Sequence, residues 1–337
     1  MPLRCGLVGV PACGKTTVFN AVTSAGTSIF DAAESHRATV SVPDLRVDRL
    51  AEFYKTGKVV RASVEIVDIP GLAEGSTAEG GRGSRLLSHI KEADALIHVV
   101  RCFAAPEEPA NPVPDVETVD LELMVADAQT LDRKIARLAK KVRIGDKYAV
   151  REAEDCEKVL RGLHAGVPAR NQGLTETEQA SVADCHLISQ KPVLYVANVA
   201  LPRDAEGPAA SALRSRANAE GSDVVSISGR EEADISELPS EDRGPFLAEL
   251  GLAELSIDRL IRAAYRKLGL VDFFTAGEKE VHVWTCRRGD TAPIAAGKIH
   301  TDMERGFIRM EVIAYDDLMA CGSESAAAKA GKRRLEG

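Results

Sequence analysis

Short apolar runs alternate with amphipathic segments along most of the chain. Apolar runs of roughly four to eight residues, bounded by Gly, Pro or Asp, are typical of buried strands. They predict strands within residues 5–8, 62–69, 94–102, 193–198 and 223–229. Helical patterns are predicted from residue 18, over 45–54 and over 255–268. Helices that alternate with buried strands are typical of an α/β fold with a parallel sheet.

The period becomes helical at Glu117 and stays helical to residue 163, with a Gly-Asp break at 145–146. A further helix over 175–187 begins at Thr175, whose hydroxyl is expected to form a capping box with Glu178. These segments predict an inserted helical arm with a basic stretch. The basic residues are Arg133, Lys134, Arg137, Lys140, Lys141, Arg143, Lys147 and Arg151. In an acidic protein, such a stretch either meets RNA phosphates or forms a solvated helix face.

The pattern changes again after Gly269. Strands over 280–285 and 306–312 and a helix over 323–335 predict a small α+β module. The predicted domains are therefore a sheet domain of residues 1–116 and 190–269, an arm of residues 117–189 and a module of residues 270–337.

The composition excludes several classes of protein. Of the 337 residues, 45% are hydrophobic and 28% are charged. No run approaches the roughly 18 apolar residues that cross a bilayer. The formal charge of −8 argues against a protein that coats nucleic acid with its whole surface. Seven scattered cysteines without C-x-x-C spacing indicate reduced thiols. Because the first strand leaves no room for a signal peptide, we expect a cytoplasmic protein. We also expect a monomer that binds no membrane.

The first predicted strand leads into Gly9-Val10-Pro11-Ala12-Cys13-Gly14-Lys15-Thr16-Thr17, which matches G-x-x-x-x-G-K-T. This spacing lets a glycine-permitted turn direct successive backbone N–H groups at a polyphosphate. Residues 11–17 are therefore predicted to wrap the phosphates. Lys15 is expected to reach the β- and γ-phosphates, and the Thr16 hydroxyl is expected to bind Mg²⁺.

Asp68 and Gly71 follow a second buried strand. An aspartate at this place can hold a Mg²⁺-bound water, while the Gly71 N–H can bond the γ-phosphate. The glycine-dense run over 71–83 predicts a segment that rearranges between nucleotide states. Thr39 either completes the Mg²⁺ shell or is an ordinary loop threonine. Leu72 stands where Ras-type enzymes place the glutamine that orients the attacking water, so another group must position that water.

The strand over 193–198 ends in Asn198-Val199-Ala200-Leu201, where guanine-specific GTPases carry N-K-x-D. The carboxylate that reads guanine is missing, which favours ATP. The next strand ends in Ser228-Gly229, a turn of small residues that can lie over the edge of a base.

Two further residues leave alternatives open. His98 lies inside an apolar strand and is either a buried core histidine or a catalytic one. Cys13 is either a thiol activated by the nearby helix N-terminus or an inert small residue of the loop.

Together these segments resemble the Obg-like ATPase family, called YchF in bacteria, over essentially the whole chain. The resemblance rests on G-V-P-A-C-G-K-T-T, V-D-I-P-G-L, H-V-V-R-C-F and K-P-V-L-Y-V-A-N-V, and on D-F-F-T-A-G and A-A-G-K-I-H-T-D-M-E-R-G-F-I-R-M-E-V-I-A-Y-D-D-L of that family's TGS domain. It implies a P-loop G domain interrupted by a coiled-coil arm, a C-terminal TGS domain, and slow Mg²⁺-dependent hydrolysis of ATP at least as well as GTP. It also implies contact with the ribosome or RNA through the arm and the TGS domain.

Carried over by position, the resemblance implies that Thr16 and Thr39 meet Mg²⁺ and that Asn198 and Val199 contact the base. Family members continue beyond the equivalent of Gly337. We therefore expect an incomplete TGS domain, with an unpaired sheet edge that makes it the least stable part of the molecule.

Three functions are compatible with these residues. The first is an ATPase that switches a ribosome-facing surface, with Lys15, Gly71 and Leu72 as the catalytic positions. The second is a nucleotide-sensing module that binds RNA or the ribosome with negligible turnover, because no side chain is evident to position the water. The third is a GTPase of the Obg type.

Overall fold

The computed structural model describes residues 3–25, 37–72, 75, 87–104, 109–236, 238 and 242–337. The chain divides into two compact units, Met1–Ser41 with Val64–Leu268, and Val42–Ser63 with Gly269–Gly337. Most of the glycine-dense run that is predicted to rearrange with nucleotide lies outside the described residues. No helix in the described part is both long and apolar enough to cross a bilayer.

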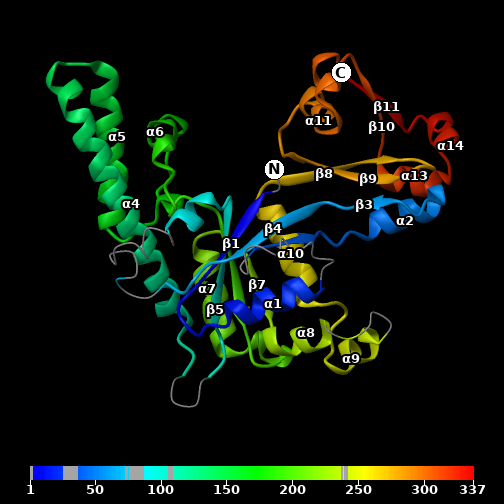
Figure 1. Ribbon diagram of the computed structural model, residues 1–337, viewed down its shortest axis with the longest axis horizontal. Coiled ribbons are helices and arrows are strands. Elements are labelled where there is room, and N and C mark those ends of the chain that lie inside the picture. Colours follow the sequence, from blue (N-terminus) through cyan, green and yellow to red (C-terminus); the bar gives the residue numbers. More distant parts are fainter. Residues whose placement is uncertain are drawn as a thin grey trace. The chain divides into compact units, whose positions relative to one another are not determined.

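A six-stranded sheet forms the centre of the first unit, with the strand order β2-β4-β1-β5-β6-β7 (Figure 1). Its strands are β1 (Arg4–Val8), β2 (Arg37–Ser41), β4 (Ser63–Asp68), β5 (Ala95–Arg101), β6 (Val193–Asn198) and β7 (Val224–Ile227). The pairs β1-β4, β1-β5, β5-β6 and β6-β7 are parallel. The apolar runs form strands as predicted, because parallel strands buried on both faces contain few polar residues.

Helices follow the strands of this unit. They are α1 (Lys15–Ala25), α4 (Pro112–Arg143), α5 (Lys147–His164), α6 (Glu176–Val182), α7 (Pro208–Ala219), α8 (Gly229–Ser236), α9 (Arg243–Glu249) and α10 (Ser256–Lys267). Leu96 and Tyr195 of the sheet belong to one buried cluster with Leu123 of α4 and Leu213 of α7. The core thus joins the sheet to both the arm and α7.

The predicted arm is a hairpin of α4 and α5, inserted between β5 and β6 (Figure 1). Its helices enclose two apolar clusters, one around Leu131 and Val159 and one around Leu138 and Ala149. Helix α4 begins at Pro112 and not at Glu117, since a proline fits the first turn, where the backbone N–H needs no partner. The capping box predicted at Thr175 is confirmed.

Two small sheets form the second unit, with the orders β3-β9-β8 and β10-β11. Its elements are α2 (Leu45–Tyr54), β3 (Val59–Val60), β8 (Leu270–Ala276), β9 (Val281–Arg287), α11 (Ala292–Ile299), α12 (Thr301–Arg305), β10 (Met310–Ile313), α13 (Tyr315–Cys321), α14 (Glu324–Lys329) and β11 (Arg333–Glu336).

Residues 42–63 belong to this second unit, which differs from their predicted place in the sheet domain. Strand β3 pairs with β9, so that Val59 is the partner of Val281. On α2, the Arg46 guanidinium lies 4.9 Å from the ring centroid of Phe274. The helix itself is predicted correctly, but its partners are more than two hundred residues away, and no local pattern reveals them.

The helix predicted over 323–335 is wrong in its second half. Helix α14 ends at Lys329, and Gly331 has a φ of 69°. A glycine in this left-handed region is a common helix terminator. The chain then returns as β11, antiparallel to β10.

Candidate nucleotide site

The predicted phosphate loop connects β1 to α1 at the carboxyl end of the parallel strands. Its backbone is left-handed at Ala12 (φ 60°) and at Gly14 (φ 91°). A Cβ on Gly14 would lie only 2.1 Å from Asn198 Nδ2, so this position must remain glycine. Helix α1 begins at Lys15, and the first N–H groups of a helix have no partner within it. This end of α1 is therefore suited to bind an anion.

The Lys15 side chain folds over the loop and is 8% exposed. Its Nζ donates to the carbonyl oxygens of Gly9 at 3.2 Å and of Val10 at 3.1 Å. A Cβ placed on Gly71 would lie 3.2 Å from the same Nζ. The ammonium thus lies between the phosphate loop and the glycine that is predicted to sense the γ-phosphate.

Thr16 and Asp68, the two predicted Mg²⁺ ligands, lie in contact. Thr16 Oγ1 donates to Asp68 Oδ2 at 3.1 Å, because β1 and β4 are neighbours and end at the same edge of the sheet. In the described part of the chain, no group of three or more His, Cys, Asp or Glu could hold a metal ion. A hydroxyl and a carboxylate nevertheless suit Mg²⁺, which usually takes one or two protein ligands and completes its shell with phosphates and water.

Thr39 is half-buried in β2, the outer strand beside β4. No hydrogen bond among the described residues joins it to Thr16 or Asp68. Its role as a third Mg²⁺ ligand stays a prediction.

Leu72 reaches the loop through its backbone only. Its N–H donates to Gly9 O at 3.0 Å, while its side chain is fully buried in the core of the first unit. A side chain in that core cannot orient a water molecule. The predicted catalytic contribution of the Leu72 position is therefore restricted to its main chain.

Asn198, at the end of β6, holds the loop in place. Its Nδ2 donates to Cys13 O at 2.9 Å, and its Oδ1 accepts the Gly229 N–H at 3.3 Å. The side chain is thus occupied at both ends and is 4% exposed. The sequence predicts a base contact for Asn198 but does not reveal this link to the loop. An asparagine at the carboxyl end of a strand beside the loop is the signal that could have suggested it.

The other residues of the predicted base side are largely buried. Val199 is 3% exposed and Ser228 is 2% exposed. Ser228 Oγ donates to Ala200 O at 2.9 Å. The end of β6 therefore contacts both the phosphate loop and the start of α8. Contact of Val199, Ser228 and Gly229 with a base stays a prediction.

The thiol of Cys13 is buried, which raises its pKa despite the nearby ammonium of Lys15. A thiol with a raised pKa carries little thiolate at neutral pH. Burial therefore favours the second alternative, in which Cys13 is an inert small residue of the loop.

His98 on β5 is a buried core histidine, the first of its two alternatives. Burial, followed by the positive charges of Arg170, Lys15 and Arg216, lowers its pKa to about 3. Within the described part of the chain, its buried Nε2 has no hydrogen-bond partner. The ring is neutral at pH 7 and packs 5.4 Å from the ring of Tyr195.

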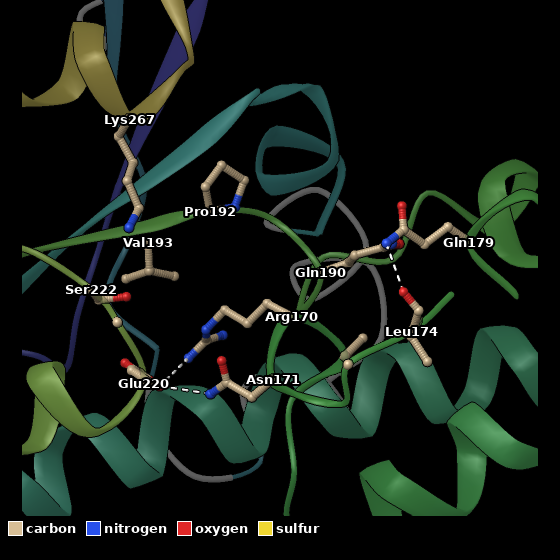
Figure 2. Close-up of a pocket in the computed structure, with 13 residues that line it drawn as sticks. Arg170, Asn171, Leu174, Gln179, Gln190, Pro192, Val193, Glu220, Ser222 and Lys267 are labelled. Atoms are coloured by element: carbon tan, nitrogen blue, oxygen red, sulfur yellow. Dashed lines mark hydrogen bonds and ion pairs between the residues drawn. The ribbon is translucent and has the colours of Figure 1, made fainter. Parts of the chain in front are cut away.

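A polar cavity of about 440 Å³ lies at the other end of β6, where the strand begins at Val193 (Figure 2). Figure 2 shows Arg170 in its middle, directed at Glu220. Arg170 Nη2 lies 2.6 Å from Asp120 of α4 and 3.7 Å from Glu220, which follows α7. This group of charges was not recognised in the sequence, since its members are far apart along the chain.

Glu220 is the centre of that group. It accepts hydrogen bonds from the Tyr195 hydroxyl and from Asn171 Nδ2, and it pairs with Arg216 Nη1 at 3.0 Å. Burial opposes its ionisation, but these hydrogen bonds and the nearby arginines outweigh burial and lower its pKa. The two carboxylates of the group, Asp120 and Glu220, already face two arginines, Arg170 and Arg216. We therefore interpret this group of charges as an anchor that joins the arm to the sheet.

Comparisons with known proteins cover the whole chain. Residues 4–150 match a family model described as a 50S ribosome-binding GTPase, and residues 270–337 match a YchF GTPase C-terminal model described as a protein of unknown function. The chain is 41% identical to the ribosome-binding ATPase YchF of Bacillus subtilis, over 100% of this chain and 95% of that protein. It is 38% identical to the protein of the same name from Mycoplasma genitalium, over 99% and 95%.

A comparison with solved structures also finds a YchF protein. The YchF GTPase of Schizosaccharomyces pombe has a TM-score of 0.86 and 31% identity, and the match covers 99% of this chain and 94% of that one. A GTP-binding protein from Pyrococcus horikoshii, with a TM-score of 0.60 and 17% identity over 93% and 94%, has a similar fold.

Proposed function

The chain belongs to the YchF family, and from this membership and the geometry of the phosphate loop we propose that it is a Mg²⁺-dependent ATPase that acts as a ribosome-associated switch. The observation that carries the proposal is the meeting of Lys15, Thr16 and Asp68 at one edge of the sheet. These groups supply a cation for phosphate oxygens and two oxygens for a metal ion. Relatives named ribosome-binding ATPases support both the proposed ATPase activity and the proposed association with the ribosome.

The loop residues bind the triphosphate. The N–H groups from Ala12 to Thr17 surround the phosphates, and Lys15 Nζ exchanges its two carbonyl partners for β- and γ-phosphate oxygens. Thr16 and Asp68 would hold Mg²⁺, which neutralises charge on those oxygens. The Gly71 N–H bonds the γ-phosphate, and the loss of that phosphate releases the segment that follows. Thr39 is proposed as the further Mg²⁺ ligand in the nucleotide-bound state.

Hydrolysis in the free protein is expected to be slow. Because the Leu72 side chain is buried, the attacking water must be placed by main-chain groups, by another side chain or by a partner. This feature favours a second candidate function, a nucleotide-sensing module with negligible turnover.

The base side favours ATP used at least as well as GTP. Leu201 stands where a carboxylate would read guanine, and no carboxylate at 198–201 replaces it. The description of the matched family model as a GTPase favours a third candidate, an Obg-type GTPase.

We further propose that the arm, residues 117–189, is a coiled-coil element that meets RNA through its basic face. Residues 270–337 are proposed to form a TGS-type domain that also faces the ribosome. On this view the protein acts as a monomer in the cytoplasm.

Phosphate release tests the proposal. The purified chain is given ATP or GTP with Mg²⁺, with and without ribosomes, beside a Lys15→Ala control. We expect slow release from ATP that rises with ribosomes and falls by roughly a hundredfold or more in the control, as when one charge-stabilising donor is lost. Release no greater than in the control under either condition would support the sensing module instead. A large preference for GTP would support the Obg-type GTPase.

A further inference from the structure

The tip of the arm exposes two large apolar side chains. Tyr148 is 89% exposed and Ile144 is 82% exposed. In the described part of the chain, no other large hydrophobic residue is more exposed than Tyr148. Both lie in or beside the turn between α4 and α5, at the end of the hairpin away from the sheet (Figure 1).

The turn that presents them is well formed. Gly145 has a φ of 79°, which suits a glycine, and the N–H of Asp146 donates to Lys141 O at 3.2 Å. Asp146 caps α5 by accepting the N–H groups of Tyr148 at 3.0 Å and of Ala149 at 3.2 Å. Beneath the turn, Ala149 packs in the outer apolar cluster of the arm. The Tyr148 ring therefore projects from a fixed first helical turn, since its own backbone is part of the cap.

Cationic residues flank Tyr148 on both sides of the turn. Of the residues from 139 to 151, the cationic ones are Lys140, Lys141, Arg143, Lys147 and Arg151. All five are exposed, and none forms an ion pair with a described residue. Asp146, the cap, is the acidic residue of this segment. By contrast, Lys134, nearer the sheet, is buried and paired with Glu152 and Asp184.

Unpaired RNA fits this surface best. Five free cations complement phosphates, and an exposed aromatic ring offers a face on which a base can stack. Bases within an A-form duplex are already stacked and paired, whereas bases in loops and bulges are open to aromatic side chains. A membrane surface would call for a broad apolar face, but here two apolar side chains stand among charges.

We propose that the tip of the arm binds an unpaired RNA segment, with Tyr148 stacked on a base, Ile144 against the neighbouring nucleotide and the five cations on the phosphates. This inference rests on the ribosome association proposed above, and it adds the chemistry of recognition and the residue that carries it.

The test measures binding of the full chain to a labelled RNA hairpin with an unpaired loop, and to the same stem as a blunt duplex. We expect the hairpin to bind more tightly. Tyr148→Ala should weaken hairpin binding about tenfold or more, as for other stacking residues. Tyr148→Phe, which keeps the ring, should bind like the unchanged chain. Phe246→Ala, which removes a 47% exposed ring from α9, serves as the matched control and should have no effect.

The proposal would be overturned by equal affinity of Tyr148→Ala and the unchanged chain for the hairpin, by equal affinity for hairpin and duplex, or by binding of anionic lipid vesicles in place of RNA. Ribosome binding that is lost in Tyr148→Ala while hairpin binding is retained would assign the tip to a protein partner and would also contradict it. Release of phosphate without ribosomes should be unchanged in Tyr148→Ala, so failure of the tip and failure of the ATPase proposal are distinguishable.

Discussion

The two ends of the parallel sheet differ in the partners of their buried cations, which are neutral groups at one end and carboxylates at the other. At the carboxyl end, Lys15 bonds to two carbonyl oxygens and forms no ion pair with a described residue, and the loop is held by the neutral amide of Asn198. At the amino end, Arg170 lies among carboxylates in a group where charges face opposite charges. Strand β6 joins the two, since it begins beside the cavity and ends at Asn198.

This difference separates a binding site from an anchor. A buried cation whose counter-charges are in place gains little from a ligand, whereas a lysine bonded only to neutral groups, here two carbonyl oxygens and the Cys13 sulfur, gains strongly from a polyphosphate. The proposed nucleotide site therefore lies at one end of the sheet, while the charged group at the other end joins the root of the arm to the sheet.

Removing Arg170 should have the largest effect on stability. Arg170→Ala leaves Asp120 buried without its closest partner, and breaking such a pair typically costs about 3–5 kcal/mol. Denaturant unfolding measures this loss. Arg161→Ala, which removes a 70% exposed partner of an exposed pair on α5, is the control and should change the free energy of unfolding by less than about 0.5 kcal/mol. Equal losses in the two variants would mean that the group is not an anchor.

His98 lies between the two ends and should give the next largest effect, seen in the pH dependence of stability. Its pKa is about 3 in the folded chain against 6.5 for an ordinary histidine. Between these values the unfolded chain binds a proton that the folded chain does not. The contribution of His98 to the free energy of unfolding is thus fully present above about pH 6.5, and it declines as the pH falls toward about 3.

From pH 7 to pH 5 the loss should be about 2 kcal/mol. Unfolding at the two values, compared between the unchanged chain and His98→Gln, isolates this contribution, because other titrating groups are common to both. His164→Gln, on the exposed end of α5, should keep the full pH dependence. The same loss in His98→Gln as in the unchanged chain would show that His98 is not the group responsible.

Asn198→Ala should have the smallest effect on stability, because it breaks neutral hydrogen bonds. It leaves Cys13 O and Gly229 N without their partner, at a cost of about 1–2 kcal/mol. Since the loop loses its link to β6, ATP affinity should fall as well, by about tenfold for a loss of that size. Unfolding and ATP titration measure the two effects, with the exposed Asn218→Ala as the control. A stable variant with full ATP affinity would remove Asn198 from the site.

Local patterns were sufficient for most of the sheet and for the loop. The apolar runs predicted five of the six strands of the first unit, and the spacing of Gly9, Gly14 and Lys15 predicted the loop between β1 and α1. Strand β2 (Arg37–Ser41), which carries Thr39, was not predicted. Neighbouring strands then brought Thr16 to Asp68, as expected for residues at one edge of a parallel sheet.

Contacts between distant residues that no motif assigns to a site were not predictable. The hydrogen bond from Asn198 to Cys13 spans 185 residues, and the one from Arg170 to Asp120 spans 50. The pairing of β3 with β9 moved residues 42–63 out of their predicted domain for the same reason. Each of these contacts depends on how helices and strands pack against one another, and this packing cannot be predicted from composition or periodicity.

The Mg²⁺ dependence of ATP binding tests most directly whether the carboxyl end of the sheet is the site. ATP is titrated into the unchanged chain and into Asp68→Asn, each with Mg²⁺ and with a chelator. The unchanged chain should bind ATP about tenfold or more tightly with Mg²⁺, and Asp68→Asn should lose most of that gain, because Asp68 and Thr16 would hold the ion. An equal gain from Mg²⁺ in both proteins, or no ATP binding by the unchanged chain, would contradict the assignment.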